Sequence, residues 1–296
     1  MNGSRRRFIL SASGLLVAAS MPRAVRAAGI ILPPRRLSTA RYFNGTSSDT
    51  LQATMASTSD QTFSALSVAV WINSTSSGTK SIFRRGDQTA SPYVSYGLAQ
   101  LANGTGGSVG DGWDFMVGTG GGITHLVADN NSSGGNPVVF GRWAHLAGTW
   151  DGTTMRVFVN GVEKKNVANA GTMAALDTHF SIGYDVGFGE YWLGSLAHVA
   201  VWNAALGLGE INALARGVLP PEVRQQSLHL YYPLSGNSSP EKNEISSKYA
   251  AAVTGTRMSD GPSVMAKSQR IAYFPAPAAA SGGCSQRIAL LGVGCK

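Results

Sequence analysis

The 296-residue sequence is poor in charged residues, and it contains few cysteines. Asp, Glu, Lys and Arg make up only 14% of it, whereas glycine occurs 37 times. Surface helices usually carry many charged side chains at four-residue spacing, so this composition argues against a helical bundle. It favours many short strands joined by turns, and a single large β-sandwich is a normal outcome at this length.

The two cysteines, Cys284 and Cys295, both lie near the C-terminus. No four Cys or His residues have the close spacing of a structural zinc site. In an oxidising compartment the two cysteines could form a disulfide, and the sequence equally allows two free thiols. The sequence therefore argues against a zinc site, and it leaves open both the pairing of Cys284 with Cys295 and the binding of any other metal.

Acidic residues are absent from the first 27 positions, although five arginines lie there. The net charge of +8 for the whole chain depends largely on this segment, because the remainder has 19 basic and 16 acidic residues. Phosphate binding needs a clustered basic face rather than a small excess of positive charge. We therefore expect no nucleic-acid partner.

Residues 4–10, with the sequence SRRRFIL, resemble a twin-arginine export motif. An apolar run at 9–20 and the small residues around Ala27 follow it, and the run is shorter than the roughly 20 residues that span a bilayer. We expect residues 1–27 to be an export signal, with no integral membrane anchor, so that a bacterial cell places the protein in the periplasm or outside. An ordinary secretory signal is the alternative, and it leads to the same conclusion.

Short β-type runs separated by Gly, Asn, Asp and Ser begin at Tyr42. In residues 66–73 the alternate positions Leu66, Val68, Val70 and Ile72 share one strand face, which predicts a core strand. Further strands are expected at 81–84, 93–98, 113–117, 123–128, 143–150, 155–159, 180–184, 192–202 and 228–234. A single short helix is expected at 208–216, before Gly217.

Two turns are clear from the dipeptides Asp151-Gly152 and Asn160-Gly161, which tolerate the positive φ of tight hairpins. They predict three successive antiparallel strands. The fold class is thus all-β, an antiparallel two-sheet β-sandwich with one short helix. We expect a linker at 28–40, the sandwich at 41–235, and an edge segment with a low-complexity tail at 236–296.

The sequence WAHLAGTWDGT at 143–153, followed by MRVFVNG at 155–161, closely resembles the central hairpins of laminin G-like and concanavalin A-like domains. The segments at 42–45, 66–73 and 193–203 resemble other parts of that family in the same order. The resemblance implies a jelly roll that binds carbohydrate, matrix components or other proteins, often with calcium. Where the family usually carries an acidic pair, this sequence has Ala197 and His198, which puts a calcium ligand there in doubt.

Catalytic patterns are missing. Glycoside hydrolysis generally needs two carboxyl groups that face each other, and the Glu-x-Asp-x-x-Glu pattern of sandwich-fold glucanases does not occur. The pairs Asp111/Asp114 and Asp185/Glu190 are interpreted as solvated loop carboxylates. The Gly-x-Ser-x-Gly string at 106–110 lies in a glycine-rich loop instead of a strand-to-helix turn. The scattered histidines are interpreted as half-buried strand residues: His125, His145, His179, His198 and His229.

Ligand binding is better supported, because sugar rings stack on aromatic side chains while carboxylates accept hydrogen bonds from hydroxyl groups. Aromatic and acidic residues in two Gly-rich loops provide the candidates: Asp111, Trp113, Asp185, Glu190, Tyr191 and Trp192. The alternative for Trp113 and Trp192 is a place in the core.

The leading hypothesis is an exported, non-catalytic module that binds carbohydrate or a cell-envelope or extracellular partner. One alternative is a structural or interaction protein of an envelope assembly, with residues 262–296 as its docking element. Another is a divergent concanavalin-fold glycoside hydrolase that uses Asp111, Asp114, Asp185 and Glu190.

Overall fold

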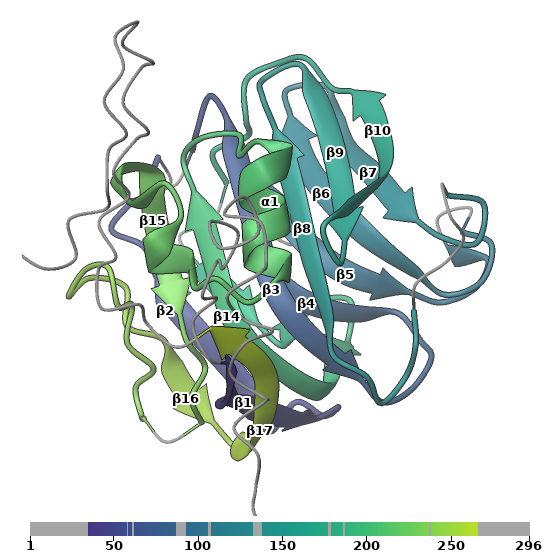
Figure 1. Cartoon of the computed structure of the whole chain (residues 1–296). Coiled ribbons are helices and arrows are strands. Elements are labelled where there is room, and N and C mark those ends of the chain that lie inside the picture. Colours follow the sequence, from purple (N-terminus) through teal and green to yellow (C-terminus); the bar gives the residue numbers. More distant parts are fainter. Residues whose placement is uncertain are drawn as a thin grey trace, which may run out of the picture. The chain divides into compact units, whose positions relative to one another are not determined.

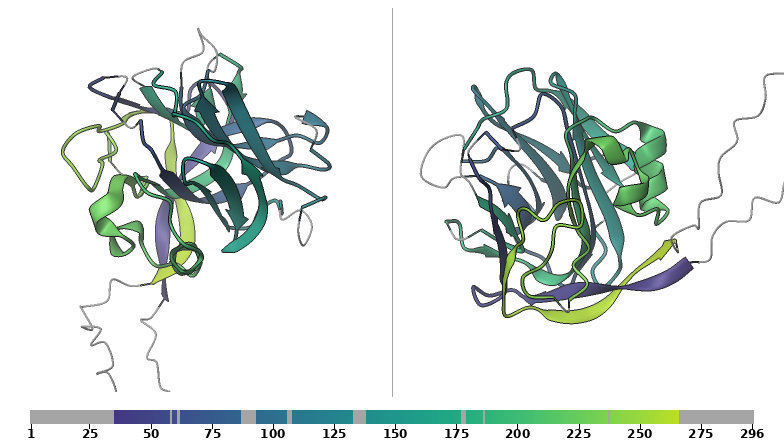
Figure 2. Two further views of the ribbon diagram at one scale, coloured as in Figure 1. Left: turned by 90° about the horizontal axis from the view of Figure 1, so that it is seen from above. Right: turned by 90° about the vertical axis from the view of Figure 1, so that its left-hand side faces the viewer.

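The computed structural model describes residues 35–265, apart from positions 58, 61, 87–92, 106–107, 133–137, 177–178, 186 and 237. Within this part of the chain, two antiparallel sheets face each other as a sandwich (Figures 1 and 2). The all-β prediction is confirmed. The signal at 1–27 and the two cysteines, Cys284 and Cys295, lie outside the described residues.

One sheet has eight strands. In order they are β10 (Val162–Ala168), β9 (Thr154–Val159), β8 (Ala144–Trp150), β3 (Leu66–Ser74), β14 (Leu193–Trp202), β1 (Arg35–Asn44) and β17 (Arg257–Met265). The eighth strand, β15 (Leu228–Tyr232), pairs with β14 beyond the end of its pairing with β1.

The other sheet has seven strands. Their order is β16 (Ala252–Thr254), β2 (Thr50–Thr54), β11 (His179–Ile182), β4 (Lys80–Arg85), β5 (Tyr96–Leu101), β6 (Gly112–Thr119) and β7 (Gly122–Ala128). A two-stranded hairpin, β12 (Tyr184–Asp185) with β13 (Glu190–Tyr191), follows β11.

The main core lies between the two sheets and is built from alternate residues of each strand. Leu66, Val68, Val70 and Ile72 are all buried in it, as the alternation predicts. Gly148 of β8 also faces this layer, where any Cβ would collide with the Phe115 ring of the opposite sheet. The glycine therefore lets the two sheets approach closely at this point.

Helix α1 (Leu208–Ala215) packs on the outer face of the eight-stranded sheet (Figure 1), at the position that the sequence predicts. Ile211 and Leu214 of the helix belong to a second apolar cluster with Ala69, Ala147 and Ala200 of three adjacent strands. The small alanine side chains let the helix lie close to the sheet. No helix among the described residues has the length and apolar character needed to cross a membrane.

The two predicted turns are present. At the β8–β9 turn the Asp151 carboxylate accepts hydrogen bonds from the backbone N–H groups of Thr153 and Thr154, at 3.0 and 2.8 Å. At the β9–β10 turn Asn160 and Gly161 have φ values of 51° and 82°. The three successive antiparallel strands β8, β9 and β10 follow from these turns.

The eight-stranded sheet begins before the start predicted for the sandwich, and it includes a strand from the segment predicted to lie at the edge. Strand β1 begins at Arg35, inside the segment predicted as a linker, and it pairs with β17, which lies in the predicted edge segment. A buried ion pair of 2.6 Å joins Arg41 of β1 to Glu241, which precedes β16 in the predicted edge segment. Such pairing over more than 200 residues leaves no local periodicity in the sequence, and Gly261 and Pro262 further obscure β17.

Candidate functional site

The outer face of the seven-stranded sheet carries polar side chains over strands β4 to β7. Trp113, Phe115 and Val117 of β6 point into the core, so the side chains between them point outward. Asp114 is therefore on the outer face. It lies opposite Val127 of β7, and this register places it diagonally next to His125.

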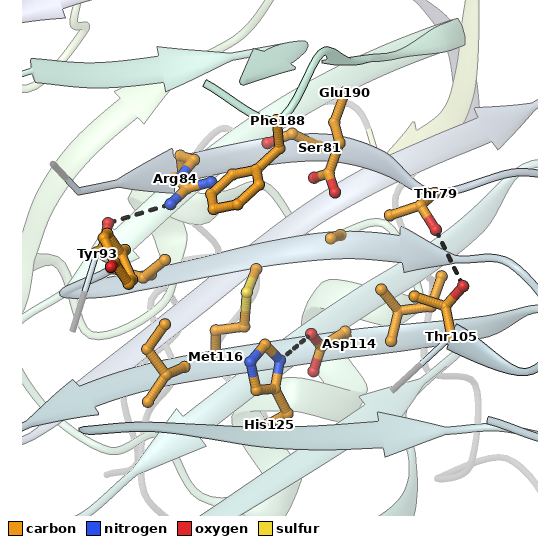
Figure 3. Close-up of a pocket in the computed structure, with 14 residues that line it drawn as sticks. Thr79, Ser81, Arg84, Tyr93, Thr105, Asp114, Met116, His125, Phe188 and Glu190 are labelled. Atoms are coloured by element: carbon orange, nitrogen blue, oxygen red, sulfur yellow. Dashed lines mark hydrogen bonds and ion pairs between the residues drawn. The ribbon is translucent and has the colours of Figure 1, made fainter. Parts of the chain in front are cut away.

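These strands and the β12–β13 hairpin enclose a pocket of about 330 Å³ (Figure 3). That volume is at the lower end of the range for small-molecule sites. Fourteen residues line the pocket: Thr79, Ser81, Arg84, Tyr93, Val94, Ala99, Leu101, Thr105, Asp114, Met116, Ile123, His125, Phe188 and Glu190.

The β12–β13 hairpin forms one wall of the pocket. Gly183 has a φ of 81°, which lets the chain turn from β11 into this hairpin. A side chain would not fit at this position, because its Cβ would collide with the Phe43 ring. The hairpin presents Phe188, which is 60% exposed, and its ring meets the Tyr93 ring edge-on at 6.5 Å between centroids. An exposed aromatic pair thus stands at the rim (Figure 3).

Arg84 of β4 holds this wall in place. Its guanidinium forms an ion pair with the buried Asp185 of β12 and donates a hydrogen bond of 3.1 Å to the Tyr93 carbonyl. It also lies 5.6 Å from the centre of the Phe188 ring. Burial lowers the pKa of Arg84 to about 10, so the guanidinium remains charged at neutral pH.

Asp114 and His125 form a hydrogen-bonded pair, with 2.7 Å between Asp114 Oδ2 and His125 Nδ1. The Asp114 side chain is fully buried, whereas that of His125 is 48% exposed. The hydrogen bond to Asp114 raises the pKa of His125 above its ordinary value. Asp114 Oδ1 has no hydrogen-bond partner among the described residues.

Ser81 and Glu190 also bring polar groups to the pocket. The buried Ser81 hydroxyl of β4 also lacks a hydrogen-bond partner within the described part of the chain. Glu190 of β13 points toward the pocket from the hairpin side (Figure 3), and burial raises the pKa of its carboxyl group. Buried polar atoms without partners are uncommon in folded proteins, so each calls for an explanation.

The six residues predicted to bind ligand lie in different environments. Glu190 lines the pocket, and Asp185 supports it through Arg84. Tyr191 is half-buried in the hairpin, opposite Tyr184. Asp111 lies in a loop, where it accepts hydrogen bonds from Ser77 and the Asn103 backbone.

Trp113 and Trp192 are buried between the sheets as members of the main core. This is the alternative that the sequence left open for both. Their side chains present no surface to the pocket, so we leave them out of the proposed contacts.

Several pocket residues, Asp114 among them, were not predicted as ligand contacts. Asp114 was interpreted as a solvated loop carboxylate, yet it lies in β6 and is fully buried. The alternation Trp113-Asp114-Phe115 could have placed it on the outer face of a strand. Nothing local in the sequence indicates that Ser81 and Arg84 join it, because they come from β4, two strands away.

The calcium that the family resemblance implies does not fit the positions expected to hold it. Ala197 is buried and offers no side-chain oxygen. His198, at φ of 55°, hydrogen-bonds the Tyr231 hydroxyl at 2.9 Å and Ser38 at 3.3 Å. Across the described ranges, no three His, Cys, Asp or Glu residues are grouped so that they could hold a metal ion.

The antiparallel jelly roll and its sequence motifs define the class of protein. The profile of the concanavalin A-like lectin/glucanases superfamily, in its laminin G-like form, matches residues 44–212, which is more than half of the chain. The chain belongs to this family. No curated protein sequence matches it.

Solved structures share the fold. A proposed carbohydrate-binding protein from Bacteroides ovatus ATCC 8483 is similar over 78% of this chain, with a TM-score of 0.60 and 20% identity. The chain spans 62% of that protein's length. A heptameric SAP-like pentraxin from Limulus polyphemus has a TM-score of 0.51 and 17% identity, with 76% of this chain and 95% of that chain covered. At these identities the similarity establishes the fold.

Proposed function

We propose that this protein is an exported, non-catalytic module that binds carbohydrate in the pocket over strands β4 to β7. The observation that carries the proposal is the pair of buried polar atoms without partners, Asp114 Oδ1 and Ser81 Oγ, beside an apolar floor. A carboxylate oxygen accepts a hydrogen bond, and a hydroxyl group can donate or accept one. Sugar hydroxyl groups would satisfy both atoms.

The apolar surface of the pocket supports the same ligand class. Met116 and Ile123 form part of the floor, and the exposed Phe188 ring stands at the rim. Sugars present apolar C–H faces next to their hydroxyl groups, so one ring can contact both kinds of surface. The similarity in fold to the Bacteroides ovatus protein, described as a proposed carbohydrate-binding protein, is consistent with this ligand class.

A glycan array followed by titration calorimetry of the strongest ligand tests the proposal. Phe188→Ala should weaken binding about tenfold, the range expected for one stacking contact. Phe140→Ala is the matched control, since Phe140 is 42% exposed and does not line the pocket. Binding that is equal in both variants, or no binding to any glycan, would contradict the proposal.

A divergent glycoside hydrolase is the second candidate, and the shared position of Asp114 and Glu190 in one pocket is the observation that favours it. Two carboxyl groups across a bond are the minimum that such hydrolysis requires. Binding without catalysis predicts that the array ligand remains intact after long incubation. Release of reducing ends by the wild type, but not by Glu190→Gln, would establish the hydrolase instead.

Export is part of the proposal and depends on the N-terminal motif. Replacing Arg5 and Arg6 by lysine should keep the precursor in the cytoplasm of a bacterial host if the twin-arginine route is used. Cell fractionation measures this outcome. Unchanged export of the double variant would indicate the ordinary secretory route.

A further inference from the structure

The polar atoms left without partners in the pocket are mainly hydrogen-bond acceptors. Asp114 Oδ1 is a buried carboxylate oxygen with no donor in the described structure. The Glu190 carboxylate enters the pocket from the opposite side (Figure 3). An ionised carboxylate can only accept hydrogen bonds, so a ligand that fits these atoms must bring donors.

The cationic groups of the pocket already have anionic partners. The Arg84 guanidinium is paired with Asp185 and further held by the Tyr93 carbonyl. The His125 ring is bonded to Asp114. Glu190 forms no direct ion pair within the described part of the pocket, and burial raises its pKa more than the nearby charges of Arg84 and His125 lower it. The site as a whole is negative.

Resting on the proposed function, we infer that the pocket prefers a saccharide with a protonated amino group and rejects acidic saccharides. An ammonium group donates three hydrogen bonds and is attracted to Glu190, and charge-assisted hydrogen bonds are about twice as strong as neutral ones. A carboxylate or sulfate on the sugar would offer no donor and would face two carboxylates. A sugar with a hydroxyl group at this position should bind with an intermediate affinity.

Attraction between the ligand and the protein as a whole does not explain such a preference. Without residues 1–27 the chain has 19 basic and 16 acidic residues, so its overall charge is positive. A cationic saccharide would be repelled by this overall charge and attracted by the pocket alone. The preference therefore reports on the local charge at Glu190.

The test compares sugars that differ at one position. Cellotetraose, the glucosamine tetramer with amino groups in place of the 2-hydroxyls, and a glucuronate tetramer are titrated by calorimetry, together with the corresponding galactose-series sugars. The amino member of a series should bind about tenfold more tightly than the neutral member, as expected for one charge-assisted hydrogen bond. The acidic member should bind more weakly than both.

Glu190→Gln should lower the affinity for the amino sugar to about that of the neutral sugar, whereas the control Glu222→Gln should leave the preference unchanged. Glu222 is exposed on a turn that packs against the other sheet. Acidic sugars that bind as tightly as neutral ones, or a preference that survives Glu190→Gln, would overturn the inference. Neutral binding without an amino preference would overturn it and leave the proposed function intact, whereas no binding across the whole array would overturn both.

Discussion

The outer faces of the two sheets differ in what covers them. The eight-stranded sheet presents Ala69, Ala147 and Ala200 to helix α1, and apolar side chains close this layer. The seven-stranded sheet presents Asp114, Met116 and His125 to an open pocket. The first face contributes to stability through burial, while the second holds polar atoms that have no hydrogen-bond partner among the described residues.

The histidines of the two faces show the same contrast. His145 and His198 are buried in the eight-stranded sheet near Leu214 of the helix, and burial lowers their pKa values to about 3 and about 4. His125 is half-exposed at the pocket, where the hydrogen bond to Asp114 raises its pKa. The covered face thus favours neutral imidazole, and the open face favours the charged form.

Among the single substitutions, removing a side chain from the covered face should give the largest effect on stability. Ile211→Ala deletes a fully buried side chain between helix and sheet, and we expect it to lower the free energy of unfolding by about 2–4 kcal/mol. Urea denaturation measures this loss. Glycan affinity measured well below the melting temperature should stay within about twofold of wild type, because the helix lies on the opposite side of the sandwich.

Ile123→Ala is the matched change at the pocket. Ile123 is only partly buried, so the loss of stability should be smaller, while glycan affinity should fall. Equal losses of stability in the two variants would show that both faces contribute to the fold in the same way.

Acid should also lower the stability of the protein, through the two buried histidines of the covered face. In the unfolded chain His145 and His198 bind protons below about pH 6.5, whereas in the native state their pKa values are about 3 and about 4. The free energy of unfolding should therefore fall as the pH decreases from about 6.5 to about 4, by at most about 1.4 kcal/mol per pH unit for each histidine.

His198→Asn should reduce this slope, and asparagine tolerates the positive φ at that position. Urea midpoints measured at pH 4.5, 5.5 and 7 provide the test. An unchanged pH dependence in the variant would contradict the assignment of the slope to this histidine.

The smallest effect is expected at His125, with the opposite sign. Its raised pKa means that the pair with Asp114 contributes stability below about pH 6.5, and this contribution is lost as the pH rises through the native pKa. His125→Gln should therefore destabilise the protein at pH 6 more than at pH 8. The difference should be under about 1 kcal/mol, since the ring is half-exposed. A larger effect at pH 8 would contradict this sign.

Strand positions were predictable where side chains alternate along a single segment. The core face of β3 and the turns at Asp151-Gly152 and Asn160-Gly161 follow from local patterns, and the structure confirms them. Strands β1 and β17 were not predicted at their full extent, because they pair with each other, and β1 is also held by the ion pair of Arg41 with Glu241. That pairing is invisible to any short window of sequence.

The candidate site was predictable only in part. Glu190 was expected to bind ligand because of its aromatic neighbours, and it lines the pocket. Trp113 and Trp192 lie in the same Gly-rich segments with acidic neighbours, yet both are buried in the core. Composition near a loop therefore identified a region of the chain, and it did not separate side chains that face the solvent from those that face the core.

The sequence by itself determined the all-β class, the helix near residue 208 and the central hairpins, because these depend on alternation and on local φ preferences. Only the tertiary structure decided which outer face stays open and that Asp114 meets His125 beneath Glu190. The physical reason is that these features depend on contacts between distant segments. Helix α1 covers only the eight-stranded sheet. The register of β6 with β7 places Asp114 beside His125, and the ion pair of Arg84 with Asp185 connects β4 to the hairpin.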